Sequence, residues 1–171
     1  MYEDDKSPGG GADVPDEIYY HQSDKVKSME SLSFIFKLDN NIFHDLIGNN
    51  LDMILVSARF RDLLDHYKLN APPYKWLNAT VESQNGKVRF EYYLMIFLEK
   101  PDILDLDNTR FVNNSLLHAA FSYSKISRYS FVPEPRVLER TLIVSEEVKN
   151  HIMAAKITGV VFDKTRIIFD D

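Results

Sequence analysis

The chain has 171 residues, of which 44% are hydrophobic and 12% aromatic; this suffices for one domain with a sizeable core and excludes wholesale disorder. Its formal net charge of −6 argues against a generally basic nucleic-acid-binding protein. The absence of cysteine excludes disulfide scaffolds, thiolate zinc sites and cysteine nucleophiles. The apolar runs are too short to span a bilayer and the N-terminus resembles no signal peptide, so we expect a cytoplasmic protein.

The negative charge is concentrated at the N-terminus. Residues 1–17 contain six acidic residues and one lysine, whereas residues 18–171 contain 20 acidic and 19 basic residues. The first segment also has few apolar side chains, so it cannot bury enough surface to offset its ordering entropy. The sequence therefore predicts a disordered acidic tail over 1–17 and a single, nearly neutral globular domain over 18–171.

The first part of this domain is expected to contain strands and one principal helix. Residues 33–38 alternate in character, which predicts a strand, and residues 40–50 predict a turn or short helix. Residues 53–56 form a short apolar run that is typical of a buried strand. Ser57 then follows as an N-cap, and apolar residues recur on one helical face, which predicts a helix over about 57–69.

The pair Asn85-Gly86 predicts a β-hairpin with a two-residue type I′ turn, because both residues tolerate positive φ. The register that this turn imposes places Glu82 opposite Arg89, a complementary charge pair. The outgoing strand continues through residues 92–98 and is apolar on both faces. We therefore expect it at the centre of the sheet, covered on both sides.

The second half of the chain contains shorter elements. The acidic segment 101–107 predicts a loop. Ser145, followed by two glutamates, predicts the N-cap of a second helix over about 145–157, and Gly159 is expected to mark its end. The other expected elements are a helical turn at 115–121 and strands at 126–132, 142–144, 160–162 and 167–169.

Two stretches match without a gap at an offset of 88 residues, so that Ser57 aligns with Ser145 and Tyr74 with Phe162. Both stretches read as strand, serine cap, amphipathic helix and aromatic-containing strand. An internal duplication accounts for the match, and so does the ordinary pattern of any capped strand–helix–strand unit. Either way, two helices of similar length should pack on one sheet. The predicted fold class is α+β, with a mixed, mainly antiparallel sheet and two principal helices.

Serine and histidine side chains give little sign of catalysis. Ser57 and Ser145 each follow a strand and open a helix, as a hydrolase nucleophile does. Neither lies in a G-x-S-x-G motif, so the helix cap alone explains both. The five histidines form no H-x-x-x-H or H-E-x-x-H arrangement and are expected to be ordinary surface or boundary residues.

A metal-dependent hydrolase is one alternative function. The segment Asp102–Asp107 holds three carboxylates, which suit magnesium or calcium, and His118 follows nearby. The segment has neither the glycine nor the distal glutamate of an EF-hand, and solvated carboxylates or turn caps account for the same residues. We therefore expect no catalytic residue, no bound metal and no cofactor.

Four short segments together resemble a known family. They are I-L-V-S at 54–57, I-L-D-L-D at 103–107, L-I-V-S-E at 142–146 and T-G-V-V-F at 158–162. In this order and spacing they are similar to the bacterial immunity proteins of polymorphic toxin systems, specifically the eleventh numbered immunity family, earlier a domain of unknown function. The sequence departs from that pattern at Ala58 and Arg59, where an acidic residue is common after the serine.

The resemblance implies a binding protein and not an enzyme. Its partner would be a cognate secreted toxin whose active site it blocks, a nuclease being one candidate, with no nucleic-acid or membrane partner. An acidic patch would suit a cationic nuclease cleft. An interaction domain with no link to toxins fits the sequence as well. Apart from the tail, the expected partner-binding carboxylates are those of Asp102, Asp105, Asp107, Asp163, Asp170 and Asp171.

Overall fold

A five-stranded sheet lies at the centre of the protein. The computed structural model describes residues 34–38, 41–49, 53–99, 101–112, 115–134 and 141–169. The strand order is β1-β4-β5-β3-β2, with β1 parallel to β4 and the other neighbours antiparallel, which confirms the predicted α+β class with a mixed, mainly antiparallel sheet. The strands are β1 (Phe34–Lys37), β2 (Leu46–Ile47), β3 (Ile54–Ser57), β4 (Tyr74–Glu82) and β5 (Arg89–Phe97).

β4 and β5 form the predicted hairpin in the predicted register, and the Arg89 guanidinium lies 2.8 Å from the Glu82 carboxylate across it. The expected type I′ turn does not form. Gly86 has a φ of 68°, but Asn85 lacks the positive φ that this turn requires at both positions. Instead, the side-chain oxygen of Asn85 accepts the Lys87 N–H at 3.1 Å, and this bond stabilises a different loop.

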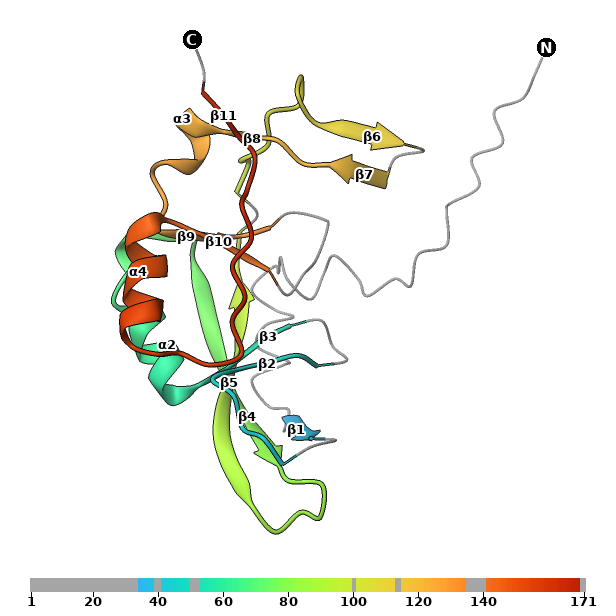
Figure 1. Ribbon diagram of the computed structural model, residues 1–171, viewed down its shortest axis with the longest axis vertical. Coiled ribbons are helices and arrows are strands. Elements are labelled where there is room, and N and C mark those ends of the chain that lie inside the picture. Colours follow the sequence, from blue (N-terminus) through green and yellow to red (C-terminus); the bar gives the residue numbers. More distant parts are fainter. Residues whose placement is uncertain are drawn as a thin grey trace, which may run out of the picture.

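The central strand β5 is buried on both faces from Tyr92 to Phe97, as the continuous apolar sequence of this part predicts. Two helices, α2 (Ala58–Asp65) and α4 (Glu146–Ala154), pack side by side on one face of the sheet (Figure 1). Apolar residues of both helices share one buried cluster with β3, β4 and β5. A second cluster, which includes Leu55, Val81 and Leu94, occupies the other face.

A serine caps each of these helices. The Ser57 hydroxyl accepts the Phe60 N–H at 3.2 Å, and the Ser145 hydroxyl accepts the Val148 N–H at 3.3 Å. Each bond satisfies one of the backbone donors that a helix N-terminus leaves without an intrahelical partner. The chain therefore turns from strand to helix at both serines by the same local device.

Both helices are shorter than the spans of 57–69 and 145–157 that the sequence predicts. α2 gives way to a separate 3₁₀ turn, η2 (Lys68–Asn70). α4 ends in a Schellman motif: Lys156 adopts a φ of 52°, and the Ile157 N–H donates to the Ile152 carbonyl at 3.2 Å. Lys156, and not Gly159, therefore ends the helix. No helix in the described part of the chain is long and apolar enough to cross a membrane.

The remaining elements are short and differ most from the predictions. Segment 40–50 contains the edge strand β2 and not a short helix, and segment 115–121 forms strands where a helical turn was expected. The strand expected at 126–132 begins only at Phe131, and residues 160–162 form no strand. The elements are β6 (Arg110–Val112), β7 (Ser115–His118), β8 (Phe121–Ser122), α3 (Tyr123–Ile126), β9 (Phe131–Pro133), β10 (Leu142–Val144) and β11 (Ile167–Ile168).

The proposed internal repeat extends through the two helices but not beyond them. Strand β3 and helix α2 correspond to β10 and α4. Tyr74 then opens β4 and is buried, whereas its counterpart Phe162 lies outside any strand and is 37% exposed. The chain after α4 instead runs as an extended segment to β11, which pairs in parallel with β8 (Figure 1).

Candidate functional site

The acidic segment 102–107 is a loop that lies along β8. Leu104 forms an antiparallel bridge with Phe121, and the Asp105 N–H donates to the Ala120 carbonyl at 2.9 Å. Ile103 and Leu104 are buried against β8, while Asp102 and Asp107 are exposed. The apolar residues therefore fix the loop to the body and direct carboxylates toward solvent.

Two of the three carboxylates of this loop, those of Asp105 and Asp102, have local partners. Asp105 forms a turn, in which its carboxylate accepts the backbone N–H groups of Asp107 and Asn108, both at 3.1 Å. Asp102 forms an ion pair with Lys125 at 2.9 Å, and both side chains are partly or largely exposed. A surface pair of this kind contributes little to stability and can be exchanged for another partner. Asp102 and Asp107 are therefore the members of the loop best placed to meet a partner.

The metal-hydrolase alternative requires these carboxylates and His118 to converge. Within the described residues, which include Asp102, Asp105, Asp107 and His118, no group of three acidic or histidine side chains is placed to hold a metal ion. One carboxylate oxygen of Asp105 accepts backbone N–H groups within its own turn, and the other accepts the side-chain amide of Asn108. The geometry therefore gives this alternative no support.

Apolar side chains are exposed on the other side of β8. Tyr123 follows β8 directly, and its ring packs on that of Phe169 with centroids 4.7 Å apart. Tyr123 is 47% exposed and Phe169 70% exposed. Figure 1 shows α3, β8 and β11 together at one end of the molecule. β8 is thus bordered by the acidic loop on one side and by an exposed aromatic pair on the other.

Asp163 lies apart from the acidic loop, on the extended segment between α4 and β11. It is exposed, and so are its neighbours Lys164 and Arg166. This segment is therefore locally basic despite Asp163. Asp170, Asp171 and the tail 1–17 fall outside the described residues, so the described structure brings together only the loop carboxylates among the expected set.

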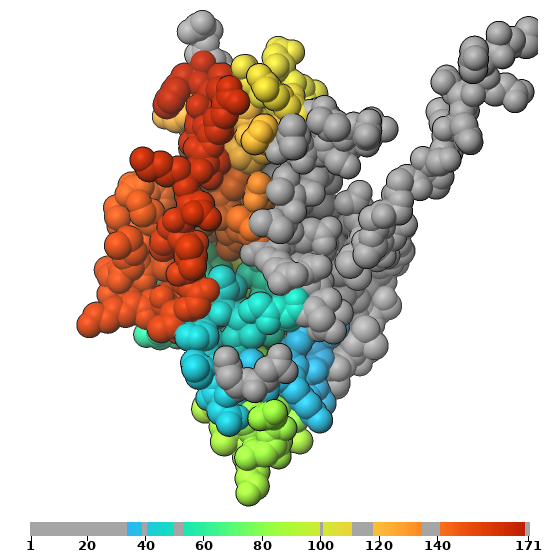
Figure 2. Space-filling view, turned by 45° about the vertical axis from the view of Figure 1, so that its right-hand side comes forward, coloured from blue at the N-terminus to red at the C-terminus, as the bar shows by residue number. Residues whose placement is uncertain are grey.

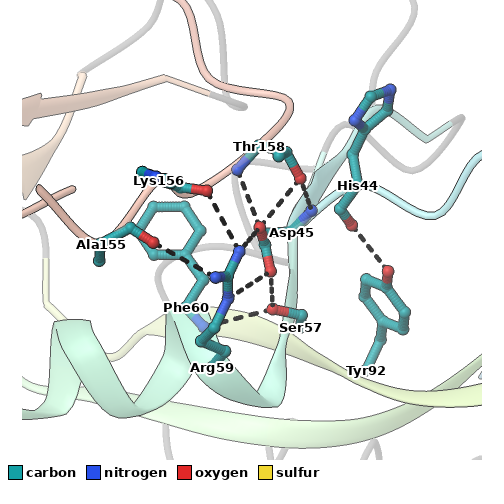
Figure 3. Close-up of polar contacts among 9 residues, drawn as sticks. All are labelled: His44, Asp45, Ser57, Arg59, Phe60, Tyr92, Ala155, Lys156 and Thr158. Carbon is teal, nitrogen blue, oxygen red and sulfur yellow. Dashed lines mark hydrogen bonds and ion pairs between the residues drawn. The ribbon is translucent and has the colours of Figure 1, made fainter. Parts of the chain in front are cut away.

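Among the described residues, one polar side chain that the sequence did not single out accepts several hydrogen bonds and an ion pair. Asp45, just before β2, is nearly buried, with 11% of its side chain exposed (Figure 3). Its carboxylate accepts the Ser57 hydroxyl and the Thr158 N–H, each at 2.8 Å, and the Thr158 hydroxyl at 2.9 Å. It also forms an ion pair with Arg59. We call these four residues the Asp45 clasp.

Arg59 extends the clasp to the end of helix α4. Besides Asp45, it donates to the carbonyls of Ala155 and Lys156, both at 3.2 Å (Figure 3). These carbonyls belong to the end of a helix, where the dipole favours a positive charge. A single cation therefore joins the start of α2, the segment before β2 and the end of α4.

The clasp accounts for the acidity of Asp45. Burial alone would raise the pKa of Asp45, but hydrogen bonds from Arg59, the Thr158 backbone, Ser57 and the Thr158 hydroxyl outweigh it and hold that pKa well below its usual range. The nearby Tyr92 hydroxyl donates to the His44 carbonyl at 2.7 Å, and burial with the Asp45 charge raises the pKa of Tyr92 to about 12. Asp45 is thus a fixed anion and Tyr92 a fixed neutral donor at neutral pH, which suits a structural role and not proton transfer.

Gly159, which follows the clasp residue Thr158, lies very close to the backbone of β2. A Cβ atom on Gly159 would lie 2.2 Å from the Leu46 carbonyl oxygen and 2.9 Å from the His44 Cβ, and Gly159 has a φ of 81°. Only glycine fits this position without strain. Thr158 and Gly159, which open the last segment of the family resemblance, therefore fasten the C-terminal segment to β2.

One sequence signal pointed toward the clasp. Arg59 lies in the first turn of α2, where the helix dipole disfavours a cation, and it departs from the acidic residue common in the resembling family. A basic side chain in that position indicates a specific acidic partner. The partner itself lies 14 residues earlier in the chain and could not be chosen from sequence.

Comparison with protein families gives one match. The family model described as "Immunity protein family (Imm11)" matches residues 12–166, which is most of the chain. The matched range includes the central sheet, both principal helices and the clasp. Comparison with curated proteins gives no match.

Proposed function

Because the chain belongs to the Imm11 family of immunity proteins, we propose that it binds a cognate secreted protein toxin in the cytoplasm and covers that toxin's active site. The family match over residues 12–166 is the observation that carries this proposal. The geometry is compatible with a binding role, since the buried polar groups of the clasp are used in internal hydrogen bonds. On this proposal the protein acts by occlusion and catalyses no reaction.

A nuclease domain is the toxin class that best fits the acidic loop. Nuclease clefts are cationic because they bind phosphates, and complementary charge speeds the capture of such a partner. Asp102 and Asp107 present exposed carboxylates, and the Tyr123–Phe169 pair supplies adjacent aromatic surface of the kind enriched at interfaces. We place the toxin-binding surface at this end of the molecule, around β8.

Co-expression tests the immunity role directly. The toxin to use is the C-terminal domain of a large secreted protein encoded next to this chain. Expression of that domain alone should stop growth, and co-expression with this protein should restore it. Persistent toxicity while this protein is present in soluble form would show that the two are not a toxin–immunity pair.

Charge reversal tests the acidic surface. Asp102→Lys with Asp107→Lys should lower toxin affinity at least tenfold, mainly through slower association, and should weaken its dependence on salt. Asp105 should be left intact because it forms the turn. Asp62→Lys on α2 is the matched control, since Asp62 is also exposed and paired with one surface base, Arg61. Equal affinity of the double variant and the control would remove the loop from the interface.

The other expected acidic surfaces need separate measurements. Deletion of residues 1–17 should slow association if the tail steers the toxin, and should change little if the loop does. Asp163→Asn and truncation of Asp170 and Asp171 test the C-terminal carboxylates in the same binding assay. Titration with magnesium, calcium, manganese and zinc tests the hydrolase alternative, which fails if no ion gives heat or raises the melting temperature.

A further inference from the structure

The C-terminal residues 157–169, which we call the arm, lie on the surface of the protein and are fastened to it near their two ends. Figure 2 shows this segment, in red, running over one face of the molecule. The first attachment is Thr158 in the Asp45 clasp, and the second is the pairing of β11 with β8. The arm therefore bridges the edge of the central sheet and the β8 end of the molecule.

At the first attachment, Thr158 forms several hydrogen bonds with Asp45 and Leu46. Thr158 donates its N–H and its hydroxyl to the Asp45 carboxylate and accepts the Asp45 N–H on its hydroxyl at 3.0 Å. Its carbonyl also accepts the Leu46 N–H at 3.1 Å. These four hydrogen bonds join two segments that are far apart in the sequence, since Asp45 and Thr158 are separated by 113 positions. Gly159 adds the close backbone contact with Leu46.

The second attachment is smaller, and the segment between the two is loosely held. At the far end, the Phe121 N–H donates to the Arg166 carbonyl at 3.1 Å, and Phe169 packs on Tyr123. Among the described residues, 160–165 make no hydrogen bond to the body. Val161 is 86% exposed and has little packing to hold it. Loss of the first attachment would therefore leave the arm held by the two-residue strand β11, the Phe169–Tyr123 contact and the partial packing of Ile157 and Val160.

Asp45 has a second set of partners that does not involve the arm. Ser57 and Arg59, at the junction of β3 and α2, hold the same carboxylate. Asp45 would thus stay in place when Thr158 leaves. The sheet and helix contacts of the main cluster also come from residues outside the arm, apart from the flanking side chains of Ile157 and Val160.

From this arrangement we propose that the arm is a strap that can release as a unit while the sheet and helices stay folded, and that the Asp45–Thr158 contact is the point that controls its release. The strap does not depend on the toxin-binding proposal and requires only the chain itself, although its last residue, Phe169, also belongs to the surface proposed to bind the toxin. Regions of low contact density with few buried apolar groups open below the free energy of global unfolding. The arm meets that description, and the central strands do not.

Asp45→Asn is the decisive variant. One carboxylate oxygen of Asp45 accepts from Ser57 and Arg59, and the other accepts from Arg59 and Thr158. Whichever way an asparagine amide is turned, its NH₂ group faces donors. In one orientation the NH₂ group meets the Thr158 donors, and in the other Thr158 bonds a neutral amide oxygen in place of a charged carboxylate oxygen. In both orientations the variant should weaken the hold on Thr158 with almost no change in volume. Asp163→Asn, an exposed change of the same kind on the arm itself, is the matched control.

Amide hydrogen exchange measured at neutral pH separates release of the arm from global unfolding. In Asp45→Asn, exchange at Thr158, Leu46 and Phe121 should accelerate at least tenfold, because these N–H groups bond the arm or belong to it. Exchange at Leu94 in central β5 should change much less, and Asp163→Asn should match the unaltered protein. Thr158→Val, which removes the hydroxyl bonds alone, should show the same pattern at smaller amplitude.

Three results would overturn the strap. If exchange at Leu94 rises by the same factor as at Thr158 in both clasp variants, the arm unfolds only with the whole protein. If exchange at Thr158 and Phe121 is unchanged, the Asp45 contact does not control the arm. A selective rise at Thr158 that does not reach Phe121 would also contradict release as a unit.

Discussion

Gly159 offers the sharpest test of how the C-terminal arm is packed. Gly159→Ala places a methyl group where it would lie 2.2 Å from the Leu46 carbonyl oxygen, far inside van der Waals contact. That oxygen belongs to the backbone of β2, so it cannot move aside as the end of a flexible side chain could. The substitution also forces alanine into a φ of 81°, which L-residues rarely adopt.

The two effects can be given magnitudes. The left-handed conformation costs a non-glycine residue about 1–2 kcal/mol. Inserting a methyl group into a packed site costs about 1–3 kcal/mol. The expected loss is therefore about 2–5 kcal/mol while the arm stays attached, and release of the arm would limit the loss to the free energy that holds it; the full value is a large part of the roughly 5–15 kcal/mol that stabilises an ordinary domain. Urea unfolding followed by circular dichroism measures this loss as a lower midpoint, with slopes of about 1–3 kcal/mol per molar urea.

Two other glycines separate these effects. Gly86→Ala meets the same conformational penalty, at a φ of 68°, but its Cβ would lie at an ordinary 3.8 Å from the Glu82 carboxylate. Gly48→Ala meets neither, because nothing lies within 4 Å and its φ is not positive. The loss of stability should rise in the order Gly48, Gly86, Gly159. A Gly159→Ala midpoint no lower than that of Gly86→Ala, together with unchanged amide exchange at Leu46, would refute the close approach to β2.

Two further predictions concern the surroundings of the clasp. Tyr92→Phe should lower stability at pH 7 by about 1 kcal/mol, the usual net value of one hydrogen bond. Because the pKa of Tyr92 is raised to about 12 in the folded protein, the contribution of Tyr92 to stability is complete below about pH 10 and falls as the pH rises toward 12. Near about pH 11.5 the urea midpoint of Tyr92→Phe should therefore be higher than that of the unaltered protein. Ser145→Ala should cost about 1 kcal/mol in the same assay, and Ser57→Ala should cost more, since Ser57 also donates to Asp45; equal costs would contradict its second role.

The parts of the fold that the sequence predicts are those with local or strictly periodic signals. The β4–β5 register follows from one turn position and from the charge pair of Glu82 and Arg89. The starts of α2 and α4 follow from Ser57 and Ser145, whose caps depend on residues three positions away. β5 is central because its side chains are apolar on both faces. Each of these features can be read within about ten residues of chain.

The parts that the sequence misses depend on distant partners. β2 contains only two residues, too few to show any periodicity. β2 exists because β3 pairs with it and because Thr158, over a hundred positions later, holds its start. The segment 115–121 has helix-compatible residues, but pairing with β6 and β11 makes it extended. Tertiary contacts override weak local preference at both places.

The candidate site shows a related limit. Sequence reasoning grouped carboxylates by sign and spacing, and it treated Asp102, Asp105 and Asp163 alike. The structure gives them different roles, because Asp102 pairs with Lys125, 23 positions away, and Asp105 closes its own turn. Asp163 is followed by the exposed basic residues Lys164 and Arg166. Net charge along a segment therefore predicts where carboxylates occur, but not which of them can still bind a partner.

The residues that carry the family resemblance are largely framework residues. Ser57 and Ser145 cap helices, and Thr158 with Gly159 fastens the arm. A polar group whose hydrogen bonds are already made inside the protein can bind a toxin only by giving up those bonds, which costs about 1–3 kcal/mol for each buried group left unpaired. Such residues can identify the scaffold, but they are poorly suited to choose the toxin. The choice of toxin must then rest on exposed side chains whose loss leaves the scaffold intact, and Asp102 and Asp107 meet that condition while Asp45 does not.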